Sequence, residues 1–203
     1  MIKKRWGCIN SEAGKSGKND DDKNKASTID TSSNHIYFYS GVECETILDL
    51  KKAIMEVTID QKKMQIDFPS YTPEIFLHIN SGGGYVTDGL NAMDFIANNS
   101  IPITTIIEGH SASAATFLSM SGSHRLIQKN SLMLFHRMRG GFWGTHSEFE
   151  DEAENWALME KKIVEFYLKH SKITKKELLE MMKHEKYIDA DQALKYGFVD
   201  AII

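Results

Sequence analysis

Residues 75–97 decide the fold, and they read IFLHINSGGGYVTDGLNAMDFIA. The first five residues form a short apolar run that is suited to a buried strand. Asn80 to Gly84 then closes this run with three successive glycines. The residues that follow repeat at the spacing of one helix face, and they are Val86, Leu90, Met93 and Ala97. This order of strand, glycine-rich turn and helix is the first half of a parallel βαβ unit.

The same order recurs further along the chain. Ile103 to Ile107 is a β-branched run that leads into the small residues Ser111 to Thr116. Strand-like segments follow at Leu126-Ile127 and at Leu132 to Phe135. We therefore predict an α/β fold built from repeated βαβ units.

The N-terminal third divides into a tail and the start of the folded domain. Residues 1–34 contain few apolar side chains, so burial cannot offset their ordering entropy, and we expect a disordered tail. The folded domain is predicted to span residues 35–203. It begins with the β-favouring run Ile36 to Tyr39, followed by a helix over residues 43–58 and a polar connection over residues 59–73.

The last third is predicted to be helical and to contain one unusually long helix. The segment from Ser147 to Lys169 would be about 34 Å long at 1.5 Å per residue, which is more than a compact domain of this size needs. Its apolar stripe consists of Phe149, Ala153, Trp156, Ile163 and Phe166. Because the stripe is longer than one small domain should cover, we expect the protein not to be a monomer.

Composition excludes several classes of protein. The 203 residues are enough for one domain with a tail, and the net charge of −4 gives no electrostatic case for nucleic-acid binding. No apolar run approaches the roughly 20 residues of a membrane span, and we expect no secretory signal. Cys8 and Cys44 are too few for a disulfide framework or a zinc site and are compatible with a reducing compartment, so we expect a cytoplasmic protein.

Three local features could carry chemistry, and each also has an ordinary structural explanation. The glycines that end at Gly84 could point N–H groups at an oxyanion, although such turns are often structural. Ser111 and Ser113 follow a predicted strand, where a serine can act as a nucleophile or cap a helix. His136 ends another strand and could take a proton from a serine, although a lone histidine beside a core strand is more often structural.

Together these features resemble the ClpP family of serine peptidases, the proteolytic chamber of the Clp system. The resemblance covers about residues 36–203. The family's motifs are I-N-S-P-G-G, G-x-A-A-S-M-G-A, N-S-x-x-M-I-H-x-P-x-G-G and A-x-E-A-x-x-Y-G-L-V-D. In the same order, the similar segments of this chain are residues 79–84, 109–116, 130–141 and 190–200. Four ordered motifs at family-like spacing form a specific match, which implies the ClpP/crotonase-type fold with a long protruding handle helix.

The resemblance implies a serine endopeptidase and assigns its catalytic residues. Ser113, and not Ser111, would be the nucleophile, and His136 would be the general base. The third member of the triad falls on Glu185, where the family has aspartate. The alternative for Glu185 is an exposed charge in the polar run Lys183 to Lys186.

The resemblance also implies how substrate is bound. The backbone N–H groups of Gly84 and Ala114 would form the oxyanion hole. The Gly140-Gly141 segment would pair with an extended polypeptide substrate by strand addition. No metal and no organic cofactor is expected, because serine peptidase chemistry needs neither.

The assembly implied by the resemblance is a homo-oligomer of two stacked heptameric rings. The helix over residues 147–169 would be the handle that joins the rings, and unfolded polypeptides would be cleaved inside the chamber. The groove that docks an AAA+ unfoldase falls on Phe76, His78 and Leu126. The polar His78, and the absence of a recognisable axial loop in residues 1–34, weigh against an unfoldase partner. Such divergence suits a virus-encoded or accessory member of the family.

Two other functions remain open from the sequence. One is a catalytically inactive ring subunit that keeps the fold while a partner chain supplies the activity. The other is a crotonase-type acyl-CoA enzyme, which would share the fold and a two-amide oxyanion hole. Ser113 together with His136 favours the peptidase, because hydration of an enoyl thioester needs no serine nucleophile.

Overall fold

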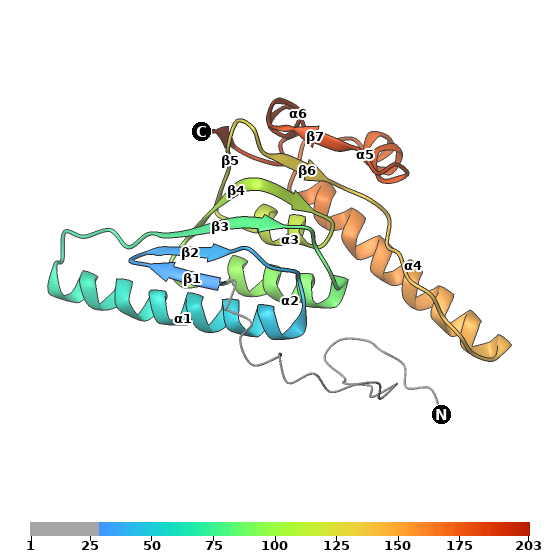
Figure 1. The fold of residues 1–203 in the computed structure, drawn as a ribbon, viewed down its shortest axis with the longest axis horizontal. Coiled ribbons are helices and arrows are strands. Elements are labelled where there is room, and N and C mark those ends of the chain that lie inside the picture. The colour runs from blue at the N-terminus through green and yellow to red at the C-terminus, as the bar shows by residue number, and fades with distance from the viewer. Residues whose placement is uncertain (1–28) are drawn as a thin grey trace, which may run out of the picture.

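The computed structural model describes residues 29–203 as a mixed α/β fold (Figure 1). The strands are β1 (Ile29–Ser32), β2 (His35–Phe38), β3 (Ile75–Ser81), β4 (Ile103–Ala112), β5 (His124–Ile127), β6 (Leu132–Leu134), β7 (Tyr187–Asp189) and β8 (Ala201–Ile202). The helices are α1 (Cys44–Asp67), α2 (Val86–Ala97), α3 (Ala115–Met120), α4 (His146–Lys169), α5 (Lys175–Met182) and α6 (Ala190–Tyr196). No helix in this part of the chain is long and apolar enough to cross a membrane.

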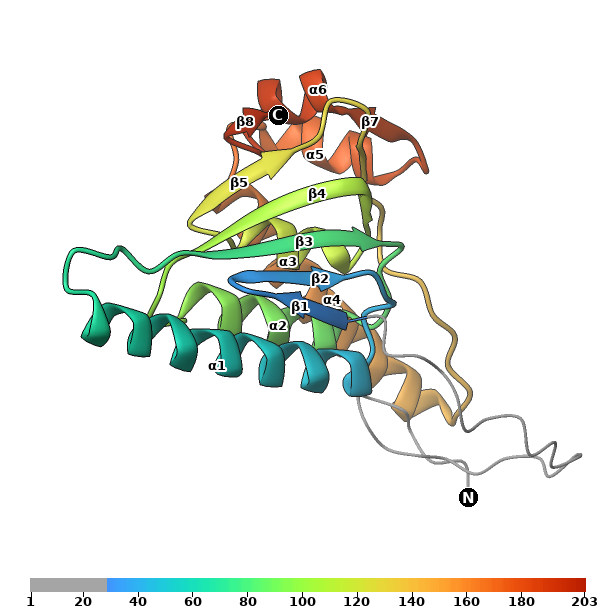
Figure 2. The same cartoon turned by 60° about the vertical axis from the view of Figure 1, so that its left-hand side comes forward.

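The strands form one sheet in the order β1-β2-β3-β4-β5-β8. β2, β3, β4, β5 and β8 are parallel neighbours along this path, and β1 is antiparallel to β2. α1 and α2 lie along the same face of the sheet (Figures 1 and 2). The predicted βαβ units are therefore present, and they place the carboxyl ends of the parallel strands at one edge, where ligand sites of such sheets lie.

β4 changes its partner halfway along its length. Its residues 104–107 pair with β5, whereas residues 110–112 pair with β6. The bend between these parts contains Gly109, whose φ is +80°, and the register with β3 shifts at the same level. β6 in turn pairs with β7, so the end of β4 belongs to a short branch of the sheet. This branch carries the chain toward Ser113.

The core is filled by branched aliphatic and aromatic side chains between the sheet and its helices. Fully buried examples are Ile36, Phe38, Ile54, Leu77, Phe117, Phe135 and Phe198. Burial of one such side chain stabilises a fold by about 1.5–3 kcal/mol.

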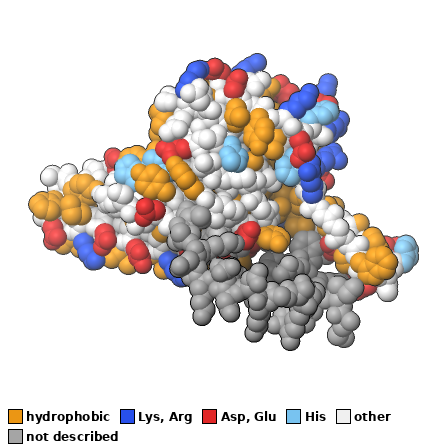
Figure 3. Space-filling model, in the orientation of Figure 1, with side chains coloured by type: hydrophobic (Ala, Val, Ile, Leu, Met, Phe, Trp, Pro, Cys, Tyr) orange, Lys and Arg blue, Asp and Glu red, His pale blue; other side chains and the backbone are white. Residues whose placement is uncertain are grey.

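α4 has two halves with different surroundings. Ile163, Phe166 and Tyr167 in its second half are buried in the core, while Phe149 in its first half is 50% exposed. The first half projects from the body, and hydrophobic side chains gather at its outer end (Figures 1 and 3). The predicted long helix is thus present, and the part of it that projects from the body carries exposed apolar side chains.

Two sequence-based boundaries were wrong. Residues 29–32 form β1, so the folded part begins before residue 35. Composition misses this strand because it is a polar edge strand that is held to β2 mainly through its backbone. α1 continues to Asp67 through residues predicted to be a connection, because Gln61 to Met64 are good helix formers and Pro69 then stops the helix.

Candidate active site

Ser113 lies in the sharp turn between β4 and α3. Its φ is +54°, a left-handed conformation that is uncommon for a residue other than glycine. Its backbone N–H donates to the carbonyl oxygen of Leu134 at 2.9 Å, which ties the turn to the end of β6. Strained backbone of this kind is typical of functional turns.

Ser111 has a different environment from Ser113. It is fully buried, and its hydroxyl donates to the hydroxyl oxygen of Ser119 at 3.1 Å. Ser113 is only partly buried and lines a pocket of about 130 Å³. Of these two serines, only Ser113 is therefore available to a substrate.

The glycine-rich loop after β3 packs directly against the Ser113 turn. A Cβ at Gly83, whose φ is +90°, would lie 2.5 Å from the carbonyl oxygen of Ala112 and 2.8 Å from the Cβ of Ser113. The loop is fixed on its other side by Val42, whose N–H donates to the carbonyl oxygen of Gly83 at 2.9 Å. Only glycine permits this close approach of two backbone segments.

Gly84 and Ala114 have backbone N–H groups that can face a bound ligand. Both residues line the pocket with Ser113. Val42 bonds to the backbone of Gly83 and Tyr85, and within residues 29–203 no hydrogen bond uses the N–H of Gly84 or Ala114. Two such donors beside a nucleophile are the arrangement that stabilises an oxyanion.

His136 lies just after β6 and lines the same pocket as Ser113. Its Nδ1 donates to the carbonyl oxygen of Arg137 at 2.6 Å, which leaves Nε2 as the proton acceptor. This tautomer is the one that a general base toward a serine requires. The structure thus brings together the two predicted residues Ser113 and His136 around one cavity.

Glu185 does not orient His136 in this structure. Its carboxylate forms an ion pair with the guanidinium of Arg139, and both side chains are more than half exposed. The hydrogen bond from Arg139 lowers the pKa of Glu185, and the charges of Arg139 and His136 lower it further. Glu185 is therefore within electrostatic reach of the imidazole, but the predicted triad is not assembled, because the Nδ1 of His136 is bonded to a backbone carbonyl.

The Gly140-Gly141 segment has no regular structure in the single chain. β6 ends at Leu134, and the following residues run beside α4 (Figure 1). A Cβ at Gly140 would lie 2.8 Å from the ring of Trp156, whereas Gly141 has open space around it. The predicted substrate-pairing strand is therefore absent here, because a strand needs a partner and this segment faces none within residues 29–203.

Two residues that the sequence did not single out connect the Ser113 turn to α4. The hydroxyl of Thr116 donates to the carbonyl oxygen of Ser113 at 2.6 Å, and the hydroxyl oxygens of Thr116 and Tyr167 lie 2.7 Å apart. Tyr167 is buried, and burial raises its pKa far above the usual tyrosine value. Nothing in the local sequence marks this contact, since the two residues are 51 positions apart.

The residues of the expected docking groove form part of a polar network on the sheet. His78 is buried, and its Nε2 and Nδ1 lie 2.8 Å from His35 Nδ1 and Glu108 Oε1, respectively. The ring of Tyr37 stacks on His78, and that of His35 stacks on Phe76. The histidine that departs from the family is thus a fully bonded member of the sheet surface.

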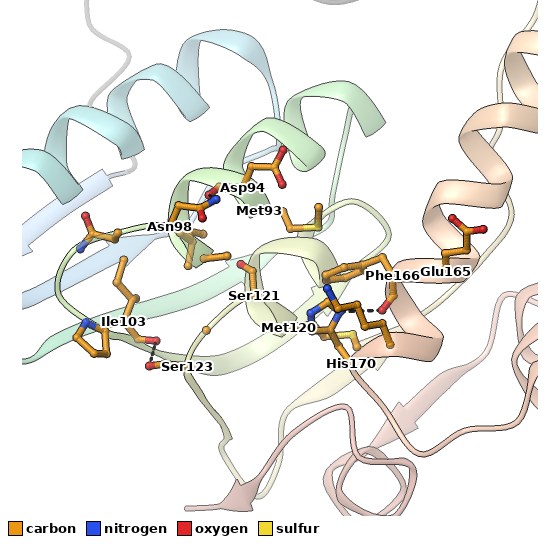
Figure 4. Close-up of a pocket in the computed structure, with 16 residues that line it drawn as sticks. Met93, Asp94, Asn98, Ile103, Met120, Ser121, Ser123, Glu165, Phe166 and His170 are labelled. Carbon is orange, nitrogen blue, oxygen red and sulfur yellow. Dashed lines mark hydrogen bonds between the residues drawn. The ribbon is translucent and has the colours of Figure 1, made fainter.

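A larger pocket of about 550 Å³ lies away from Ser113, between the ends of α2, α3 and α4 (Figure 4). Its polar groups are largely bonded to the protein itself: His170 Nδ1 to the carbonyl oxygen of Phe166, and Ser123 Oγ to that of Ile103. None of the predicted site residues lines it. In residues 29–203, no group of three or more histidine, cysteine, aspartate or glutamate side chains could hold a metal ion.

Comparison with known proteins bears on the family and the fold of the chain. The model of the Clp protease family matches residues 32–203. The chain belongs to the Clp protease family. Among solved structures, the fold is similar to that of a ClpP1 mutant from Listeria monocytogenes, with a TM-score of 0.72 and 20% sequence identity. That match covers 84% of this chain and 91% of the other. The resemblance seen in the sequence, and the fold it implied, are confirmed.

Proposed function

We propose that this Clp protease family member is a serine-type endopeptidase in which Ser113 is the nucleophile and His136 is the general base. The observation that carries the proposal is the strained turn at Ser113, which shares one pocket with His136 and with the N–H groups of Gly84 and Ala114. Family membership supports peptidase chemistry over the acyl-CoA alternative.

The reaction would proceed through an acyl-enzyme. Nε2 of His136 takes the proton from Ser113 Oγ, which forms a bond to the scissile carbonyl carbon. The N–H groups of Gly84 and Ala114 stabilise the resulting oxyanion. The C–N bond then breaks as the imidazolium protonates the leaving amine. Water adds to the ester in the same way, releasing the acid product and restoring the hydroxyl of Ser113.

The chain's assembly belongs to the same proposal. We expect a homo-oligomer, because α4 exposes Phe149 and Leu158 at 50% and 56%. The resemblance to the family implies that the oligomer consists of two stacked heptameric rings. Polypeptides would be the substrate, cleaved inside the chamber, and Gly140-Gly141 would become a strand only when it pairs with one of them. Sedimentation that gives a stable particle of only about 23 kDa at micromolar concentration would contradict the assembly.

Labelling with a fluorophosphonate probe tests the chemistry. We expect one adduct, on Ser113, and none in the Ser113→Ala or His136→Ala variants. Ser111→Ala is the matched control, because that hydroxyl is buried against Ser119, and it should still label at Ser113. Absence of an adduct in folded, assembled protein would instead support the inactive-subunit alternative.

A further inference from the structure

Two arginines, Arg137 and Arg139, follow His136 in the chain, and only one of them lines the pocket that contains Ser113. Arg137 Nε lies 3.7 Å from a carboxylate oxygen of Glu160 on α4. Arg139 pairs with Glu185 and lines the pocket that contains Ser113 and His136. Arg139 therefore stands where a bound peptide would pass.

The permanent charge in the lining of this pocket is positive. The lining contains no aspartate or glutamate, and its only permanently charged side chain is that of Arg139. A guanidinium offers a planar fork of donors that matches a carboxylate. The rest of the lining is largely apolar, so among charged side chains of a peptide an acidic one is the group that the pocket complements.

The present partner of Arg139 can be displaced. The side chains of Arg139 and Glu185 are 63% and 54% exposed, and ion pairs this exposed contribute little to stability because water and salt screen them. A substrate carboxylate held next to the pocket would compete well with Glu185, because binding of the rest of the peptide keeps it close by.

Release of Glu185 would have a consequence for His136. The carbonyl oxygen of Arg137, which now accepts from Nδ1 at 2.6 Å, fixes the tautomer but carries no full negative charge. A carboxylate in its place would also stabilise the imidazolium that forms during catalysis. Glu185 can make only one of these two contacts at a time, because its present position is set by Arg139.

We propose that Arg139 selects peptides with an acidic side chain beside the scissile bond, and that it exchanges Glu185 for this side chain, freeing Glu185 to orient His136. The inference rests on the proposed serine peptidase function. Arg139 is then a specificity-determining residue, and Glu185 is a positioning residue that acts only when such a substrate is bound.

Paired peptides test the selection. Two fluorogenic peptides that are identical except for glutamate or glutamine beside the scissile bond should differ about tenfold in kcat/KM, in favour of glutamate. Arg139→Ala should abolish the difference, Arg139→Lys should keep part of it, and Arg139→Glu should reverse it toward a lysine peptide. Lys183→Ala is the control, because this cation pairs with Glu180 and lies outside the pocket, so the preference should persist.

The exchange of partners has its own signature in kcat. Glu185→Gln should lower kcat on the glutamate peptide by about tenfold or more and change kcat little on the glutamine peptide. Arg139→Ala should raise kcat on the glutamine peptide, since Glu185 is already free, and the added Glu185→Gln change should remove this gain. A merely structural role of Arg139 would produce neither pattern.

The labelling and the peptide assays together distinguish failure of this inference from failure of the proposed function. Fluorophosphonate labelling of Ser113 without an Arg139-dependent preference would overturn this inference and leave the proposed function intact. Absence of labelling would overturn both. An equal loss on both peptides in the Glu185→Gln variant would show that Glu185 orients His136 permanently, which would overturn the exchange.

Discussion

Replacement of Gly83 with alanine tests whether the Ser113 turn depends on a backbone approach that no side chain allows. The added Cβ would lie 2.5 Å from the carbonyl oxygen of Ala112, 2.8 Å from the Cβ of Ser113 and 3.0 Å from the backbone nitrogen of Ala114. None of these atoms can rotate away, because two belong to the backbone and the third is fixed to it. The clash therefore falls on the proposed nucleophile and on one proposed oxyanion donor.

The expected magnitude follows from two terms. A left-handed φ costs an L-residue about 1–2 kcal/mol. Overpacking in a tight site costs about 1–3 kcal/mol more. In domains of this size each kcal/mol lowers Tm by about 2–4 °C, so Gly83→Ala should lower Tm by at least about 4 °C. The rate at which a fluorophosphonate labels Ser113 should fall by at least about tenfold, because small displacements of reacting groups have large effects on rate.

Gly82→Ala is the matched control for this prediction. At Gly82 the nearest atom to an added Cβ is His110 Nε2 at 3.8 Å, an ordinary contact, and φ is not in the left-handed region. This variant should keep both its Tm and its labelling rate close to those of the parent. If the two variants behaved alike, the reasoning from the Gly83 contacts would be refuted.

Three further predictions concern stability. Burial, followed by the charge of His78, lowers the pKa of His35, while Glu108 raises it. The folded state therefore binds protons more weakly than the unfolded state, and the free energy of unfolding should fall as the pH drops through about 6.5. Urea titrations should show a smaller fall in His35→Gln, and an unchanged slope would contradict the assignment. Arg125, as a hydrogen-bond donor, lowers the pKa of Asp200, to which it is bound through two nitrogens. Asp200→Asn should thus cost about 1 kcal/mol at neutral pH, and the difference from the parent should shrink as the pH falls below about 3.8, whereas a constant difference would argue against the ion pair. Finally, a chain that starts at residue 35 should melt several degrees below one that starts at residue 29, because only the longer chain keeps β1 on the edge of β2, and equal Tm values would show that β1 contributes nothing.

The sequence was sufficient for the fold because its signals are local and repeated. Strand runs, glycine-rich turns and helical spacing each depend on neighbours within about ten residues. The boundary errors occurred where such signals are weak, as in polar β1, whose pairing with β2 depends on backbone groups that composition does not report.

The candidate site was predictable in part for the same reason. Spacing alone did not separate Ser111 from Ser113 as the candidate nucleophile, because both come after the same β-branched run. The structure adds that Ser111 is buried and Ser113 is only partly buried. The partner of Glu185 could not be predicted at all. Arg139 and Glu185 lie in different irregular segments that are far apart in the sequence, so only the fold decides that they meet.

The two hydrogen bonds between Ser113, Thr116 and Tyr167 connect α4 directly to the Ser113 turn. The inner half of α4 is held in the core by the ring of Phe166, which packs edge-on against Phe117. The next residue, Tyr167, contacts Thr116 through its hydroxyl. The other half of α4, which includes Phe149, is exposed. These contacts join α4 to the carbonyl oxygen of the residue that performs the proposed attack. We therefore expect a displacement of α4 to change the geometry of the Ser113 turn.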